Sequence, residues 1–205
     1  MTVTKPTIGQ SSGWGQILND ALDSLDAAIT AIDTDTVGPA DHNLLEWAYD
    51  PALAVNNSLP TAGTVNWVRI KVRRARTVTN VVLYVATAGS TLTSGQCFAA
   101  LYTGDGNLLS DTGNMSTTWN SAGSKTMPLN APQSVTPGNY ILGFVSNGTT
   151  QPAFARSAGS AIVNVGLVGG AAARFGTANT GVTTAMPAAL SPMGPVGVGW
   201  WGALS

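Results

Sequence analysis

The apolar residues of the N-terminal stretch follow the spacing of a coiled-coil helix. Between Trp14 and Ile32 they recur at steps of four, three, four and three, which is the heptad spacing of a helix seam and not the alternation of a strand. The seam residues are Leu18, Leu22, Leu25, Ile29 and Ile32. A lone helix of this length is marginal in water, and so narrow a seam is expected to be buried between copies of itself. We therefore predict that the chain oligomerises through this helix.

Three copies fit the seam best. A dimer favours β-branched residues at one seam position and Leu at the other, whereas here Leu18, Leu25 and Ile32 share one position and Leu22 and Ile29 the other. We therefore expect a homotrimer. The alternative is an ordinary amphipathic helix that packs on the chain's own domain.

From residue 44 onward the period changes from helical to alternating, which is typical of strands. The predicted strands are Val65 to Arg74, Thr79 to Thr87, Phe98 to Thr103, Asn107 to Ser110, Lys125 to Leu129, Tyr140 to Ser146 and Val196 to Leu204. Gly104-Asp105-Gly106 predicts a tight hairpin, and Pro137-Gly138-Asn139 predicts a second one with a longer loop. Seven or eight short strands in roughly 160 residues favour a single β-sandwich. The fold class is therefore mainly β, a jelly-roll-like antiparallel sandwich preceded by a short coiled-coil helix.

Composition agrees with a turn-rich β protein. Of the 205 residues, 44% are hydrophobic and only 9% are charged, and there are 24 Gly and 11 Pro. The single cysteine excludes an intramolecular disulfide. No basic start, signal-peptide core or membrane-length apolar run occurs, so we expect a protein made in the cytoplasm with no signal peptide and no membrane insertion.

Charge divides the chain near residue 43. Eight of the ten acids lie in the first fifty residues, and five of the nine bases lie between Arg69 and Arg76. Gly38-Pro39 marks a linker. We predict an attachment segment with helix and linker over 1–42 and a β-sandwich head over 43–205. The net charge of −1 does not indicate a nucleic-acid partner.

The last fifty residues are almost free of charge. From Ser157 to Ser205 the only charged side chain is Arg174, and the run from Ala161 to Ala173 is rich in Gly and Ala. Small residues let backbones approach closely, so part of this region is expected to be covered by a neighbouring subunit. An extended uncharged loop is the equal alternative.

Two stretches resemble proteins of bacteriophage tails. The opening KPTIGQSSGWGQILNDALDSLDAAI is similar to the N-terminus of many tail and baseplate appendages. The run from Phe98 to Ala155, with its Leu-Tyr strand end, Gly-Asp-Gly turn, Thr-Trp pair and Pro-Gly-x-Tyr strand, resembles the heads of receptor-binding and minor tail proteins. The resemblance implies a trimeric tail fibre or receptor-binding protein on the virion, whose N-terminus binds other tail, baseplate or capsid proteins and whose head contacts the host surface.

Candidate catalytic residues are few, and we expect no enzyme. His42 is the only histidine and Cys97 the only cysteine, so a dyad would require chance proximity. Asp105 and Asp111 could pair as glycosidase carboxylates, but turn chemistry explains Asp105. A calcium loop lacks the required ligand spacing, and no metal or phosphate motif occurs. We predict neither metal nor cofactor.

Two surfaces are candidates for binding. For a saccharide, the aromatic residues are Trp119, in the polar stretch STTWNSAGS, and Tyr102, beside the Gly104 turn, with Asp105, Asn107 and Asn120 as hydrogen-bonding partners. For an anionic polymer, Arg69, Lys71 and Arg73 alternate along one strand and would form a positive stripe. The alternatives are that the two rings pack in the core and that the stripe is a solvated face or pairs with Glu46 and Asp50. Trp200 and Trp201 are adjacent, so at most one is free.

Two function classes therefore remain. The first is a host-surface binding module that takes a cell-surface glycan or cell-wall polymer. The second is a structural virion protein, such as a capsid-attached fibre, decoration or baseplate connector, without a host ligand. A cell-wall depolymerase is a distant third.

Overall fold

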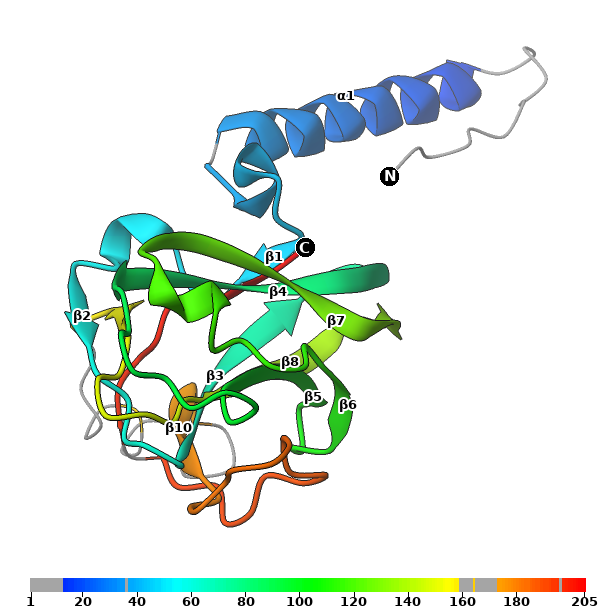
Figure 1. The fold of residues 1–205 in the computed structure, drawn as a ribbon. Helices are drawn as coiled ribbons and strands as arrows, with labels where there is room; N and C mark the ends of the chain where they lie inside the picture. The colour runs from blue at the N-terminus through cyan, green and yellow to red at the C-terminus, as the bar shows by residue number, and fades with distance from the viewer. Residues whose placement is uncertain (1–12, 36, 159–163, 165–172, 196) are drawn as a thin grey trace.

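A single long helix precedes the β region. The computed structural model describes residues 13–35, 37–158, 164, 173–195 and 197–205. Helix α1 (Gly13–Asp35) stands apart from the sheets in Figure 1. Leu18 is 52% exposed and Leu25 57% exposed, while Leu22 is half-buried. The alternative that the seam packs on the chain's own domain is therefore wrong at Leu18 and Leu25. The side chains of Ile29 and Ile32 lie outside the described residues.

The β region consists of two antiparallel sheets. Sheet A contains β1 (Glu46–Trp47), β2 (Asn56–Ser58), β4 (Arg76–Thr87), β7 (Gly123–Val135), β9 (Ala153–Arg156) and β11 (Ala203–Leu204). Sheet B contains β3 (Val65–Val72), β5 (Phe98–Thr103), β6 (Leu108–Asp111), β8 (Gly138–Val145) and β10 (Phe175–Ala178). Short 3-10 helices are η1 (Pro39–His42), η2 (Pro51–Leu53) and η3 (Thr118–Asn120). The prediction of a mainly β fold is confirmed. Within the described part of the chain, no helix has the length and apolarity needed to cross a bilayer.

The central strand of sheet A is β4. It pairs with β7 along one edge and with β11 and then β9 along the other; Figure 1 labels β4 and β7. In sheet B the order is β10-β3-β8-β5-β6. The predicted strands over Val65 to Arg74 and Thr79 to Thr87 are confirmed as β3 and β4, and the Gly104 turn joins β5 to β6 as predicted. Gly106 has a φ of +87°, a conformation that favours glycine in such a turn.

The second predicted hairpin is wrong. β7 belongs to sheet A and β8 to sheet B, so the chain crosses between sheets at Pro137. Turn residues specify that the chain changes direction, but they do not specify in which sheet the next strand pairs. The predicted last strand is also shorter, because only Ala203–Leu204 forms a strand and Trp200 makes an isolated bridge to Arg156. Val196 lies outside the described residues.

The core lies between the two sheets and is rich in aromatic rings. The inward-facing residues of β3 and β4 include Val68, Ile70, Leu83 and Val85. At the centre are Trp119, Phe144, Phe154 and Trp200. The ring centroids of Phe144 and Phe154 lie 4.8 Å apart, and those of Phe144 and Trp200 lie 5.4 Å apart in an edge-to-face arrangement, which aromatic pairs prefer.

Both outer faces of the sandwich carry a further layer of chain. On sheet B, outward-facing residues of β3, β5 and β8 pack against Ala178, Met186 and Leu190. The described part of the charge-poor C-terminal region therefore covers its own sheet; most of the run from Ala161 to Ala173 lies outside the described residues. On sheet A, the segment 44–54 packs through Leu44, Trp47, Tyr49 and Ala54 on a smaller cluster of Val82, Ala155, Trp201 and Ala203.

Candidate functional site

Trp119 lies in the core and not on the surface. Its side chain is 0% exposed, its ring meets Phe154 edge-on at 5.1 Å, and its Nε1 donates a hydrogen bond to Met127 Sδ at 3.3 Å. The expectation of an exposed ring in a saccharide site is therefore wrong. The polar stretch around it forms η3, and such a turn can expose its polar groups while it places one large ring between the sheets. Periodicity cannot reveal a core residue of this kind.

Tyr102 is buried as well. It is 0% exposed, and its hydroxyl donates a hydrogen bond to the carbonyl of Pro187 at 3.0 Å. Burial, with a smaller contribution from the charge of Asp111, raises the pKa of Tyr102 above its usual value. The expectation of an exposed ring is wrong here too, because the sequence did not indicate that residues 182–193 fold over this strand.

The three polar partners predicted for these rings are exposed but do not converge. Asp105 and Asn107 lie in the turn after β5, where the backbone N–H of Asn107 donates a hydrogen bond to Thr103 Oγ1 at 3.1 Å. Asn120 lies in η3. Shortly before η3 in the chain, the backbone N–H of Met115 donates a hydrogen bond to the carbonyl of Cys97, the residue that immediately precedes β5. Asp105 and Asn107 therefore lie near one end of β5 and Asn120 near the other, and a strand of this length spans about 17 Å.

The predicted positive stripe is not a continuous surface. Arg69 is only 7% exposed, and its Nε and one terminal nitrogen donate to the carbonyls of Ala173 and Gly104 at 2.9 and 2.8 Å. Burial lowers the pKa of Arg69. Arg73 forms an ion pair with Glu46 at 2.6 Å, which was one of the alternatives. Lys71 is exposed. The stripe prediction is therefore wrong for Arg69, and the Arg73 charge is partly neutralised.

The residues considered for catalysis are held in separate structural roles. Cys97 is buried against the carbonyl of Asn147, and burial raises the pKa of its thiol. His42 lies in η1, where its ring contacts Trp47 at a centroid distance of 5.7 Å. Asp111 accepts hydrogen bonds from the Gly113 amide and the Asn130 side chain. Among the described residues, no cluster of three or more His, Cys, Asp or Glu side chains could hold a metal ion.

The adjacent tryptophans face opposite sides of sheet A, as predicted from their alternation. Trp200 is 1% exposed in the core, where its Nε1 donates to Asn66 Oδ1 at 3.2 Å. Trp201 faces outward and is 7% exposed, and its Nε1 donates to the carbonyl of Tyr49 at 3.2 Å. Trp201 thus contributes one edge of its ring to the outer face of sheet A.

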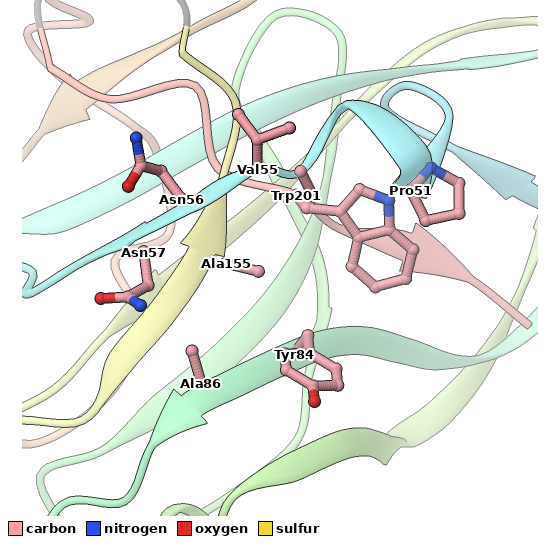
Figure 2. Close-up of a pocket in the computed structure, with 9 residues that line it drawn as sticks. Pro51, Val55, Asn56, Asn57, Tyr84, Ala86, Ala155 and Trp201 are labelled. Carbon is pink, nitrogen blue, oxygen red and sulfur yellow. The ribbon is translucent and has the colours of Figure 1, made fainter.

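The outer face of sheet A is hollowed beside Trp201. The hollow has a volume of about 470 Å³ and lies between η2 with β2 on one side and β4 on the other. Figure 2 shows the Tyr84 and Trp201 rings with Pro51 at one end and Asn56 and Asn57 at the other. The lining residues are Pro51, Ala54, Val55, Asn56, Asn57, Tyr84, Ala86, Ala155 and Trp201. We refer to this hollow as the Tyr84 hollow.

The alternation of side chains along the strands determines which residues face the Tyr84 hollow. Val82, Tyr84 and Ala86 alternate on β4 and therefore share the outward face. Asn57 is the register partner of Ala155, so its amide lies on that same face. Tyr84 is 45% exposed, and its ring and hydroxyl are available to a ligand. The exposed Asn57 side chain supplies a second hydrogen-bonding group, whereas the side chain of its neighbour Asn56, which is also exposed, points to the opposite face of β2.

The lining is apolar with a few neutral polar groups. Among the described residues that line the Tyr84 hollow, the polar side chains are one phenol and two amides, and none is charged. An amphipathic ring gives contact area at small entropic cost, and amides both donate and accept hydrogen bonds. Such a surface can bind an uncharged, hydroxyl-rich ligand. Among the described residues that line it there is no carboxylate, imidazole or thiol.

The sequence gives no sign of this hollow, because Tyr84 lies within a strong strand signal, TNVVLYVAT. The alternation places Tyr84 between Val82 and Ala86 on one face, but it does not tell which face is covered. Comparisons with protein-family models, curated proteins and solved structures found no match.

Proposed function

We propose that this chain is a bacteriophage tail fibre or receptor-binding protein that binds a saccharide of the host cell surface through the Tyr84 hollow. The observation that carries the proposal is the half-exposed Tyr84 ring in a hollow that the exposed Asn57 side chain also lines. An amphipathic ring next to an amide offers a sugar both contact area and hydrogen bonds. The two antiparallel sheets are compatible with the jelly-roll-like head that we propose for the β region.

We further propose that α1 trimerises as a short coiled coil and attaches the head to other virion proteins. The support is the seam, whose Leu18 and Leu25 are more than half exposed. A leucine seam left in water on a helix of 23 residues is unfavourable, and partner helices would cover it.

The saccharide proposal is tested with Tyr84→Ala on an array of bacterial surface glycans. Wild type should bind at least one glycan, and Tyr84→Ala should weaken that binding by about tenfold, or ~1.4 kcal/mol. Leu59→Ala is the matched control, because Leu59 is 62% exposed but does not line the hollow. It should bind like wild type. Equal binding by the Tyr84 variant, or the absence of any bound glycan, would overturn the proposal.

The trimer proposal is tested by light scattering. Wild type should have three times the mass of one chain at micromolar concentration, and Leu22→Asp with Leu25→Asp should be monomeric, because each copy would bury unpaired charge. Ser24→Asp is the control, since Ser24 lies outside the seam and is exposed. A monomeric wild type would contradict the proposal.

The second candidate function is a structural virion protein without a host ligand. The observation that favours it is a group of exposed aliphatic side chains before β3, Leu53, Val55 and Leu59, each at least 60% exposed. Such a group is typical of protein contacts. Under this alternative, Leu53→Asp and Leu59→Asp would prevent incorporation into virions, while Tyr84→Ala would have no effect on infection.

A further inference from the structure

A second hollow lies next to the Tyr84 hollow on the outer face of sheet A. It has a volume of about 380 Å³ and shares Pro51 and Trp201 with the first. Its other lining residues include His42, Asn43, Val82, Ser124 and Thr126. We refer to it as the Thr126 hollow. Because two residues line both, the two hollows are neighbours on one surface and are separated only by the Pro51 and Trp201 side chains.

The register of β4 and β7 shows how the hollows follow one another. Val82 of the Thr126 hollow precedes Tyr84 and Ala86 of the Tyr84 hollow along the outward face of β4, with a spacing of ~6.6 Å between alternate residues. On β7, Thr126 is the register partner of Val82, and Ser124 is the partner of Tyr84. The two hollows therefore meet at Pro51 and Trp201 on the outer face of sheet A, one on the β9 side of β4 and the other on the β7 side, and we refer to them together as the groove.

The chemistry of the Thr126 hollow continues that of the first. Ser124 and Thr126 supply exposed hydroxyls, Asn43 supplies an amide, and Val82 and Trp201 supply apolar surface. Among the described residues that line the two hollows, no Lys, Arg, Asp or Glu occurs. His42, whose ring contacts Trp47, is the sole imidazole in that set. A polyanion would therefore find no cationic side chains along this groove.

From these observations we infer that the groove binds an uncharged saccharide chain rather than a single sugar, with one part of the chain on Tyr84 and the next over Val82 and Thr126. The inference rests on the proposed function. Each hollow alone is at the low end of the size range of ligand pockets, whereas together they suit a ligand of several units. Tyr84 contributes the ring contact, and the hydroxyls of β7 contribute hydrogen bonds to the neighbouring units.

The test is a length series of uncharged oligosaccharides, from monosaccharides to long chains, measured by calorimetry with the full-length protein. Long chains should bind about tenfold more tightly than the shortest chain that binds at all, because they contact both hollows. Thr126→Trp should fill the second hollow, so that long chains bind only as tightly as short ones, while the affinity for short chains stays at the wild-type value.

Two further variants make the result decisive. Thr77→Trp places the same large ring on an exposed position of β4 outside both hollows. This variant should keep the full increase in affinity from short to long oligosaccharides. Thr126→Ala with Ser124→Ala removes the hydroxyls without adding bulk and should reduce the gain with length if the tryptophan variant does not fold. Binding that is independent of length, or a gain that survives both changes in the Thr126 hollow, overturns the inference but leaves the proposed function standing. Failure of every uncharged oligosaccharide to bind overturns the inference, and the proposed function is overturned with it only if the glycan array also shows no bound glycan.

Discussion

The two outer faces of the sandwich are built alike but covered differently. On sheet B, residues 182–193 fold over the outward-facing side chains, and Trp67 and Tyr102 are both 0% exposed. On sheet A, the segment 44–54 covers only part of the face, and Tyr84 remains 45% exposed. Both faces carry aromatic side chains, Trp67 of β3 and Tyr102 of β5 on sheet B and Tyr84 of β4 on sheet A. The difference between them comes from distant segments of the chain.

The comparison shows why an aromatic residue in a strand cannot be assigned a function from its own neighbourhood. Tyr102 and Tyr84 both lie in strongly apolar strands. Tyr102 packs over Gly143, where an added Cβ would lie 3.0 Å from its ring, and is then covered by the C-terminal region. Tyr84 has no such cover. The first ring therefore stabilises the fold, and the second remains available for binding.

The largest expected difference in the free energy of unfolding is between Tyr102→Ala and Tyr84→Ala. Tyr102→Ala opens a cavity under the C-terminal cover and should lower the free energy of unfolding by about 3 kcal/mol. Tyr84→Ala removes an exposed ring and should change it by no more than about 0.5 kcal/mol. Urea denaturation of both variants measures the contrast. Similar losses in the two variants would show that the two faces are equally covered.

The next contrast concerns charge on β3. Arg69→Met leaves the carbonyls of Ala173 and Gly104 without their donors, which should cost about 2 kcal/mol. Lys71→Met, two residues along the same face, changes an exposed side chain and should change stability by less than about 0.5 kcal/mol. Thermal and urea unfolding distinguish the two. If Lys71→Met cost as much as Arg69→Met, the cover over Arg69 would not be the reason for its stabilising role.

The strands themselves could be predicted from the sequence. The alternation from Thr79 gave β4 because that strand has a buried and a less buried face, whereas β3 is buried on both faces from Val65 to Ile70. The Gly104 turn gave the β5–β6 hairpin because its residues require that geometry. These are local properties. The opposite orientations of Trp200 and Trp201 follow from the same local rule.

The candidate site could not be predicted, since it depends on contacts between distant segments. Trp119 enters the core from a polar turn, Tyr102 is buried by residues more than eighty positions later in the chain, and Arg69 is bound by carbonyls from two other loops. The Tyr84 hollow arises because η2, β2 and Trp201 border the outer face of β4 and β9. None of these contacts leaves a periodic signal in the sequence.

The smallest expected effect on the free energy of unfolding concerns the segment 44–54, which covers part of the outer face of sheet A. Tyr49 belongs to that cover, and its hydroxyl donates a hydrogen bond to the carbonyl of Gly199 at 2.9 Å. Tyr49→Phe removes this bond and should lower the free energy of unfolding by about 1 kcal/mol at neutral pH. Tyr84→Phe is the matched control, because Tyr84 is on the exposed part of the same face, and it should leave stability unchanged.

The same residue gives the protein a dependence on alkaline pH. Burial, which outweighs the opposing hydrogen bonds with Ser157 and the charge of Arg156, raises the pKa of Tyr49 to about 12, whereas a tyrosine in an unfolded chain has a pKa of about 10. Below pH ~10 both states keep the proton, so this residue adds no pH dependence. As the pH rises from ~10 towards 12, the unfolded chain loses the proton first, and stability falls. Tyr102 remains in both proteins, so the difference between wild type and Tyr49→Phe isolates Tyr49. Urea midpoints measured over this range should therefore fall more steeply for wild type than for Tyr49→Phe, and parallel curves would show that the cover over sheet A leaves the Tyr49 hydroxyl in contact with solvent.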